Sequence, residues 1–452
     1  MSIRRKTRFR IKKHYRDLLS TKLQAIEYNS GNGLRGVFEV CCGWIRFITF
    51  LLWFLISRSS QQLYSLVLSL MFVPLVLLVR LIKPIVHIRI GYFDVRRMGH
   101  FAVDIGTYLA EIQLHSDLVK TRDLFFLKGE AANAQLALMV KRELAVSPFV
   151  KYLWISNRLI PGGREHQLIP AIVSVNSRDT RGLFFKTTSR LSFTAKEDCV
   201  AYKFLEEIGV EPTRKYVCFN VRDNAYLASY LNDSDWEYHN YRDCDIENYK
   251  KAALELACRG YGVLRMGKLV NEKFEIDHPL IFDYANAAQR CDFLDIWLMA
   301  NCFFCVSNGT GLDSVCDIYR IPTVMVDFIP LTHLHSWQYA ITAPKRLFWE
   351  DNESEELCLS QVLDHGYFRS REYAKAGIRV VDLHEDEIAD TVLEMEARLS
   401  NKYQESAQGE EWQNTFWEIF GSNANYHELH KFVNDSNYIS TSFIKRNPEW
   451  LR

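Results

Sequence analysis

The stretch CFFCVSNGTGLDSV, residues 302–315, joins an apolar run to a glycine-rich turn. CFFCVS is typical of a buried strand and GLDSVCDIYR, residues 311–320, of a helix, so SNGTG between them predicts a strand–turn–helix connection. Glycine allows backbone angles and a close approach by ligand that other residues do not. The free N–H groups at the start of the next helix attract anions such as phosphate. The stretch therefore predicts an α/β fold with a candidate phosphate site, and a purely structural turn is the alternative.

The same stretch contains a C-x-x-C pattern, formed by Cys302 and Cys305, which can indicate a metal or redox site. A zinc site needs further soft ligands, and the sequence has no second C-x-x-C pattern. Side chains alternate along a strand, which predicts that the two thiols point to opposite faces. The eleven cysteines show no disulfide spacing. We expect buried structural thiols in a reducing compartment.

Outward from this stretch, strand and helix patterns alternate along the chain. A first unit has expected strands at 85–93, 123–127, 151–155 and 169–175 and helices at 98–112 and 132–144. A second unit has expected strands at 215–221, 261–267, 279–285, 302–307 and 321–328 and helices at 193–210, 245–260, 291–301, 311–320 and 385–403. Such alternation predicts parallel strands with right-handed crossovers. The fold class is therefore α/β, with two facing Rossmann-like domains whose ligands bind beyond the carboxyl ends of the strands.

The N-terminal region has the composition of a membrane-associated segment. Residues 1–24 hold nine Lys and Arg against one acid, Asp17. Apolar runs follow at 44–56 and 63–82, and the second is long enough to span a bilayer. Basic residues after the second run favour the cytoplasmic side. We expect a hydrophobic helical hairpin, with a single spanning helix and amphipathic core helices as the alternatives.

These patterns divide the chain into five expected segments. They are a basic arm at 1–35, a hydrophobic membrane-associated helical segment at 36–83, an N-terminal α/β domain on the acceptor side at 84–200, a C-terminal α/β nucleotide-sugar-binding domain at 201–398, and a helical tail at 399–452. The expected location is the cytoplasmic face of the inner membrane, anchored by residues 44–82.

Two arginines stand at the ends of expected strands of the second unit. Arg222 follows KYVCFNV, and Arg265 lies near the end of YGVLRMG. If these strands share one parallel sheet, both arginines and the glycine turn meet at one edge, where guanidinium groups bind phosphate oxygens well. Surface ion pairs are the alternative. The 55 basic and 55 acidic residues of the chain cancel, which gives no indication of nucleic-acid binding.

Several segments in order resemble a family of bacterial glycosyltransferases from surface-polysaccharide gene clusters. They are YVCFNVRDNAYL, HNYRDCDIENYKKA, GYGVLRMGK and DFLDIWLMANCFFCVSNGTGLDSV with RIPTVMVDF, within residues 85–345. The resemblance implies a GT-B architecture and a nucleotide-sugar donor held mainly by the C-terminal domain, without an obligatory metal or other cofactor. The end of the strand at Arg222 also resembles the donor domain of fucosyltransferase-type enzymes, in which this Arg contacts the diphosphate. Asn220 stands where that pattern often has His.

The resemblance and the turn together give a set of candidate donor-binding residues. They are Arg222, Asp223, Arg265, Ser307, Asn308, Gly309, Thr310, Gly311 and Asp313. Asp223 is placed to orient Arg222, and Asp313 to cap the helix or contact a ribose. His239, Arg242 and His333 are candidate substrate contacts in neighbouring polar loops.

A transferase of this kind also needs a base for the acceptor hydroxyl. The best candidates are His100, in the M-G-H-F loop after the first strand, and Asp94 beside it. Two D-x-D strings, at 233–235 and 243–245, follow no apolar strand, so no metal site is expected there.

The sequence thus predicts a membrane-associated, metal-independent glycosyltransferase. Its expected partners are a nucleotide-sugar donor, a glycan or lipid-linked acceptor and the membrane, without nucleic acid. Two alternatives stay open, a nucleotide-sugar 2-epimerase of the same fold and a non-catalytic nucleotide- or sugar-binding assembly factor.

Overall fold

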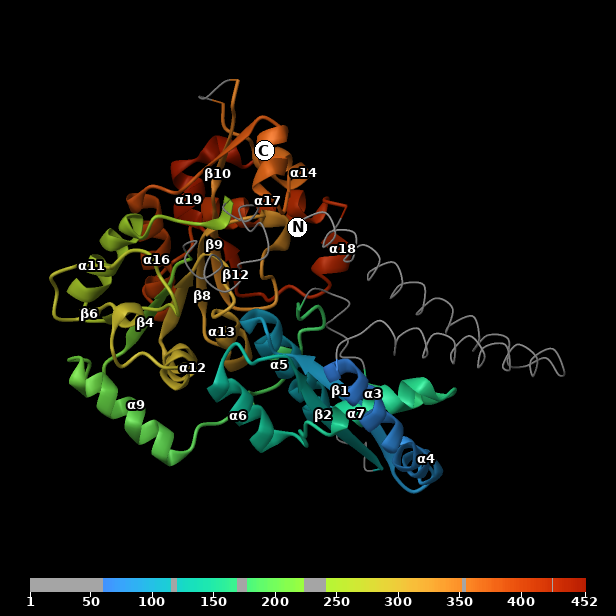
Figure 1. The fold of residues 1–452 in the computed structure, drawn as a ribbon. Helices are drawn as coiled ribbons and strands as arrows, with labels where there is room; N and C mark the ends of the chain where they lie inside the picture. The colour runs from blue at the N-terminus through green and yellow to red at the C-terminus, as the bar shows by residue number, and fades with distance from the viewer. Residues whose placement is uncertain (1–59, 115–119, 169–176, 223–240, 352–354, 425) are drawn as a thin grey trace. The chain divides into compact units, whose positions relative to one another are not determined.

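The computed structural model describes residues 60–114, 120–168, 177–222, 241–351, 355–424 and 426–452 (Figure 1). The chain divides into two compact units. Unit 1 comprises Met1–Tyr92, Val119–Phe126 and Val146–Leu168, and unit 2 comprises Phe93–Leu118, Leu127–Ala145 and Ile169–Arg452. The units interleave along the sequence, unlike the contiguous domains that we expected.

Unit 2 is built on a seven-stranded parallel sheet. Its strands are β4 (Tyr216–Asn220), β5 (Gly262–Arg265), β6 (Ile281–Phe282), β7 (Phe304–Ser307), β8 (Thr323–Phe328), β9 (Ala340–Pro344) and β12 (Asn437–Ile439). They are ordered β12-β9-β8-β7-β4-β5-β6, and every neighbouring pair is parallel. Every residue of β4, β5, β7 and β8 is buried, as expected for strands covered on both faces. The order runs outward in both directions from β4 and β7, so the topological switch point lies between these two strands.

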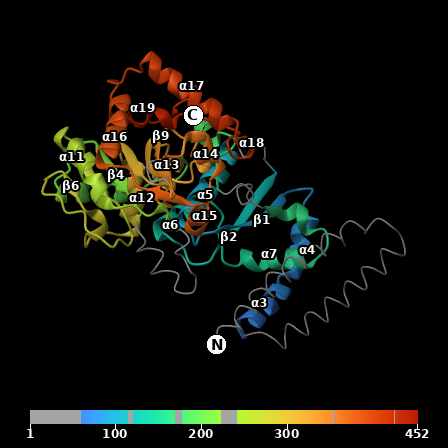
Figure 2. The ribbon, with the colours of Figure 1, turned by 90° about the horizontal axis from the view of Figure 1, so that it is seen from above.

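The sheet of unit 2 is flanked by helices that complete its core. They are α5 (Met98–Leu114), α6 (Ala134–Glu143), α9 (Ala195–Glu207), α11 (Lys250–Cys258), α12 (Asp292–Asn301), α13 (Ser314–Tyr319), α16 (Glu385–Leu399), α17 (Ala407–Gly421) and α19 (Thr441–Arg446). Helices α16, α17 and α19 contact the β8, β9 and β12 side of the sheet (Figure 2). The C-terminal segment, expected as a helical tail, therefore also supplies a strand, β12, and several core side chains, including Phe416 and Phe443.

Unit 1 holds a smaller sheet, in the order β2-β1-β3. Its strands are β1 (His87–Asp94), β2 (Thr121–Lys128) and β3 (Gln167–Leu168), and its helices include α3 (Ser60–Met71), α4 (Val73–Leu81) and α7 (Val150–Leu159). Its core joins Val76 of α4, Ile90 of β1, Phe126 of β2, and Val150 and Leu153 of α7.

Two expectations differ from the structure, and two others fall outside the described residues. The segment 151–155, expected as a strand, belongs to α7, whose buried residues Val150, Leu153, Ser156 and Asn157 follow the helical period. The apolar run 63–82 forms two helices separated at Phe72, and within the described residues no helix is both long and apolar enough to cross a bilayer. The first run of the expected hairpin, 44–56, and the expected strand 169–175 lie outside the described residues.

The cysteine geometry also differs, although the thiols are buried and free as predicted. Cys302 ends α12, before β7 begins, so the alternation of strand side chains does not apply to it. The thiols of Cys302 and of Cys316 on α13 both donate to the Met299 carbonyl, at 3.4 and 3.7 Å.

Candidate functional site

The carboxyl ends of β4 and β7 bring the predicted turn and Arg222 together. Asn220 and Ser307 are paired in register at the ends of these strands. The Asn220 amide donates to Thr310 Oγ1 at 2.6 Å, and the backbone N–H of Arg222 donates to Asn308 Oδ1 at 3.1 Å. The predicted convergence of Arg222 with the turn is therefore observed, at the switch point where ligands of doubly wound sheets bind.

The turn itself is held by an internal network around Asp313. The buried Asp313 carboxylate accepts from Ser307 Oγ and from the Thr310 backbone N–H, both at 2.8 Å, and Gly309 N–H donates to Ser307 Oγ at 3.2 Å. Burial raises the pKa of Asp313 to about 6, against the opposing effect of these donors. Helix α13 begins at Ser314, later than predicted. Two N–H groups that we expected to cradle phosphate thus already have a partner inside the protein.

Two neighbouring arginines supply positive charge at this edge. Arg222 Nε donates to Asp243 at 3.0 Å, and an Nη of Arg242 donates to the Gly309 carbonyl. Burial, and next the charge of Arg222, lower the pKa of Arg242. The buried Nε of Arg242 has no hydrogen-bond partner among the described residues. Two close guanidinium groups, one with an unsatisfied donor, favour an anionic ligand.

The N-terminus of α5 reaches the same turn. A Cβ on Gly311 would lie 3.0 Å from the backbone nitrogen of Gly99, and a Cβ on Gly99 would lie 3.3 Å from Ser314 Oγ. Glycine at both positions allows this approach. The amides of the first turn of a 17-residue helix, with the positive end of its dipole, therefore stand beside Gly311.

His100 follows Gly99 in α5 and is hydrogen-bonded through Ser177 to Asp104. Ser177 Oγ donates to Asp104 Oδ1 at 3.1 Å and lies against His100 Nδ1. Because the one hydroxyl proton of Ser177 goes to Asp104, its oxygen accepts from Nδ1–H of His100, which leaves Nε2 as an acceptor. Burial, and next the charge of Arg97, lower the pKa of His100, whereas burial raises the pKa of Asp104 to about 6. No pattern in the sequence indicates Ser177, a non-glycine residue at φ +57°.

Asp94, the other candidate base, is committed to salt bridges. It pairs with Arg96 and lies 3.7 Å from the Lys128 ammonium. The hydrogen bond from Arg96 is the main effect that lowers the Asp94 pKa. An anionic carboxylate of lowered pKa is a weak base, so the geometry favours His100.

His333 ends a 3-10 turn, η6 (Leu331–His333), after β8. Its backbone carbonyl accepts from the buried Arg178 at 2.9 Å, and its ring contacts Phe368 edge-on. Burial, followed by the charges of Arg178, His430 and Arg242, lowers its pKa to about 3. His333 is therefore a neutral group next to the cationic edge.

The remaining predicted residues lie elsewhere or outside the described residues. Arg265 ends β5 but is 1% exposed, donates to the Glu272 carbonyl at 2.6 Å and lies 3.6 Å from Asp283. Its charge is thus held inside the protein instead of at the sheet edge. Asp223 and His239 are outside the described residues.

One group of three potential metal ligands, Cys244, Asp327 and Asp382, occurs among the described residues, with ligand atoms within 4.8 Å of one another. The buried ammonium of Lys345 donates to Asp382 and lies 2.7 Å from the Asp243 carbonyl. This lysine supplies a positive charge to the group, which we interpret as a buried ion network.

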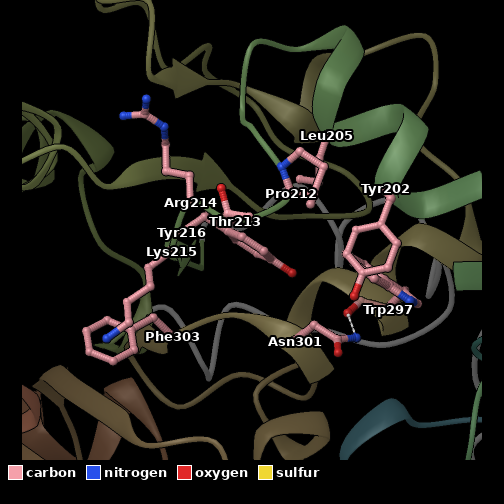
Figure 3. A pocket seen from close by; sticks show the side chains of 10 residues that line it. All are labelled: Tyr202, Leu205, Pro212, Thr213, Arg214, Lys215, Tyr216, Trp297, Asn301 and Phe303. Carbon is pink, nitrogen blue, oxygen red and sulfur yellow. Dashed lines mark hydrogen bonds between the residues drawn. The ribbon is translucent and has the colours of Figure 1, made fainter. Parts of the chain in front are cut away.

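A cavity of about 290 Å³ lies at the opposite, amino-terminal edge of the sheet (Figure 3). Arg214, Lys215 and Tyr216 at the start of β4 line it, together with Asn301 and Phe303 before β7. It is therefore separate from the carboxyl-terminal edge that carries Arg222 and the turn.

No protein-family model matches the sequence, and no curated protein sequence matches it. Among solved structures, the chain matches the glycosyl transferase family 9 protein of Veillonella parvula, with 14% sequence identity and a TM-score of 0.37. The match covers 57% of this chain and 86% of that chain. The E. coli ADP-heptose LPS heptosyltransferase II has 12% identity, a TM-score of 0.32 and coverages of 57% and 90%. The iron-containing dodecameric glycosyltransferase TibC of E. coli has 12% identity, a TM-score of 0.31 and coverages of 71% and 78%. These values are too low to assign a family or an activity.

Proposed function

We propose that the protein is a glycosyltransferase that takes its sugar from a nucleotide-sugar donor and whose reaction needs no metal ion. The observation that carries the proposal is the meeting of Arg222, Arg242 and the start of α5 at the switch point of the parallel sheet. The acceptor that we propose is a surface-polysaccharide or lipid-linked glycan at the cytoplasmic face of the inner membrane, in keeping with the resemblance and the apolar N-terminal region.

The donor diphosphate is the group best suited to this edge. It is anionic and rich in acceptor atoms, and the edge offers two guanidinium groups and the helix amides beside Gly311. In this proposal the network around Asp313 fixes the turn, and the arginines and the helix amides bind the diphosphate. An anion at this edge also offers an acceptor to the buried Nε of Arg242.

In the chemical step that we propose, the base and the groups that stabilise the leaving diphosphate come from neighbouring elements. His100 Nε2 takes the proton of the acceptor hydroxyl, and the hydroxyl oxygen forms the new bond to the anomeric carbon. The bond from that carbon to the diphosphate breaks, and the leaving nucleotide keeps the electron pair. Arg222 and Arg242 stabilise the negative charge that develops on the diphosphate, the role that a metal ion has in other transferases.

The test measures nucleotide binding by the full chain and by variants at the two ends of β4. Wild type should bind at least one of ADP, GDP or UDP in calorimetry without added metal. Arg222→Ala should weaken that binding by about 10- to 100-fold, since charged hydrogen bonds contribute about 1.5–3 kcal/mol. Arg214→Ala, at the amino-terminal start of β4, is the control and should bind as wild type does.

Two outcomes contradict the proposal. One is the absence of binding to any of these nucleotides in folded protein. The other is equal affinity of wild type and Arg222→Ala. Binding without turnover of any nucleotide-sugar in the presence of glycan acceptors would favour the non-catalytic alternative.

A further inference from the structure

The outer face of α3 and α4 is an apolar surface on unit 1. Among the described residues, eight of the seventeen exposed large apolar side chains occur within residues 67–85. They are Val67, Leu70, Met71, Leu75, Leu77, Leu78, Leu81 and Ile85, and their exposed fractions run from 42% to 77%. We call these eight residues the apolar face. A soluble surface rarely gathers so many large apolar side chains, which marks an interaction site.

The inner face of the same helices is firmly attached to unit 1. Val76 and Val79 are buried, and α3 and α4 both pack on α7. The Arg80 guanidinium donates to Asn157 Oδ1 at 2.8 and 3.1 Å and to the Pro161 carbonyl at 2.6 Å. Ser156 also donates to the Ser69 carbonyl. These polar contacts keep α3 and α4 along the surface of unit 1, with the apolar face turned outward.

The chain that leads into α3 has matching chemistry. The apolar run WIRFITFLLWFLI at 44–56 precedes it, and the nine basic residues of 1–24 precede that run. Basic segments bind anionic lipid headgroups, and apolar helix faces enter the acyl-chain boundary. An anionic lipid bilayer offers a binding partner for both the basic segment and the apolar helix face.

We propose that the apolar face docks unit 1 onto an anionic membrane, with α3 and α4 lying in the interface. This deepens the membrane association within the proposed function, because it assigns the contact to specific side chains and to an in-plane geometry. In place of a spanning second helix, the run 63–82 has one face packed on protein and the other on lipid.

The experiment is flotation of the full chain with vesicles of phosphatidylethanolamine and phosphatidylglycerol. Wild type should float with the vesicles. The double variant Leu77→Glu/Leu78→Glu should lose most of this binding, with the vesicle-bound fraction reduced by about tenfold, because two charges would have to enter the acyl-chain boundary. The matched control Leu138→Glu/Leu254→Glu places the same charges at exposed leucines of α6 and α11 and should float as wild type does.

Other occupants of the apolar face give different results. If a second copy covers it, light scattering without vesicles will show a dimer that the double variant dissociates. If residues 44–56 cover it, the double variant will unfold at lower denaturant concentration, with no vesicle binding by wild type. Either result overturns the proposal, as does equal flotation of the double variant and wild type.

Nucleotide binding is measured on the same proteins. If the double variant no longer floats but keeps its nucleotide affinity, the result supports the membrane role of the apolar face and leaves the sugar-transfer proposal untouched. If wild type binds no nucleotide, the sugar-transfer proposal fails, whereas the flotation result still decides the role of the apolar face.

Discussion

At the scale of single residues, Ser177 changes how His100 is understood. The sequence indicated His100 as a candidate base but not the serine that fixes its tautomer, because these residues lie 77 positions apart. The Ser177 hydroxyl links His100 to Asp104, which leaves Nε2 of His100 as an unprotonated acceptor. In the proposed reaction Ser177 is thus a positioning residue, and its role is separable from that of His100 as the base.

Replacement of Ser177 by Ala should lower kcat by about tenfold or more, since a general base contributes about 10²–10⁴-fold. KM for the donor should change little, and the acid limb of the pH–rate profile should shift. Ser177→Thr, which keeps the hydroxyl, should restore much of the rate. An unchanged kcat and pH profile in Ser177→Ala would contradict the assignment.

The two candidate bases can be separated by their own variants. His100→Ala should abolish turnover and leave nucleotide affinity intact. Asp94→Asn should keep most of the activity, because Arg96 and Lys128 hold that carboxylate as an anion of lowered pKa. Steady-state rates with a full pH profile check both, and the reverse pattern would make Asp94 the base.

At the scale of elements, long periodic segments were predictable and contacts between them were not. The expected helix at 193–210 corresponds to α9, where Thr194 and Glu197 have the spacing of a capping box and form both of its hydrogen bonds. The five-residue window 151–155 failed because its helical period shows only over the whole of α7. The approach of Gly99 to Gly311 depends on how α5 packs beside α13, which local pattern does not encode.

That approach gives a prediction for Gly311→Ala. The new methyl group would lie 3.0 Å from the Gly99 nitrogen, so α5 has to shift, at a cost of about 1–3 kcal/mol. We expect weaker nucleotide binding and a lower free energy of unfolding. Gly421→Ala, where a Cβ meets nothing within 4 Å, is the control. Urea titration and calorimetry measure the two effects, and wild-type values for Gly311→Ala would contradict the described contact.

The salt bridge of α9 with α6 gives an acid-dependent prediction. The hydrogen bond from Arg142 is the main effect that lowers the Glu197 pKa from 4.5 to about 2. A lowered carboxyl pKa stabilises the fold above the unfolded value, and this contribution is lost as the pH falls from about 4.5 to 2. Glu197→Gln should therefore be less stable than wild type at pH 7, with a smaller difference near pH 2. Glu206→Gln, exposed on the same helix, should show neither effect in urea titrations.

At the scale of the whole molecule, the C-terminal segment belongs to the main core of unit 2. The sequence showed its aromatic richness, but not that β12 pairs with β9, since such pairing joins residues about a hundred positions apart. Phe443 is fully buried, so Phe443→Ala should cost about 3–5 kcal/mol of unfolding free energy. Phe185→Ala, 64% exposed in the folded chain, should cost far less in the same urea titration. Similar values for the two variants would contradict the integration of this segment.

The contact between α5 and the turn after β7 has a kinetic consequence. The helix that carries His100 and the edge that carries Arg222 belong to one compact unit. In the proposed reaction, the spacing between the proton acceptor and the leaving group is then set by packing inside this one unit. Thickening the solvent with sucrose should leave a rate limited by this step unchanged, whereas steps governed by diffusion or segmental motion would slow in proportion to viscosity.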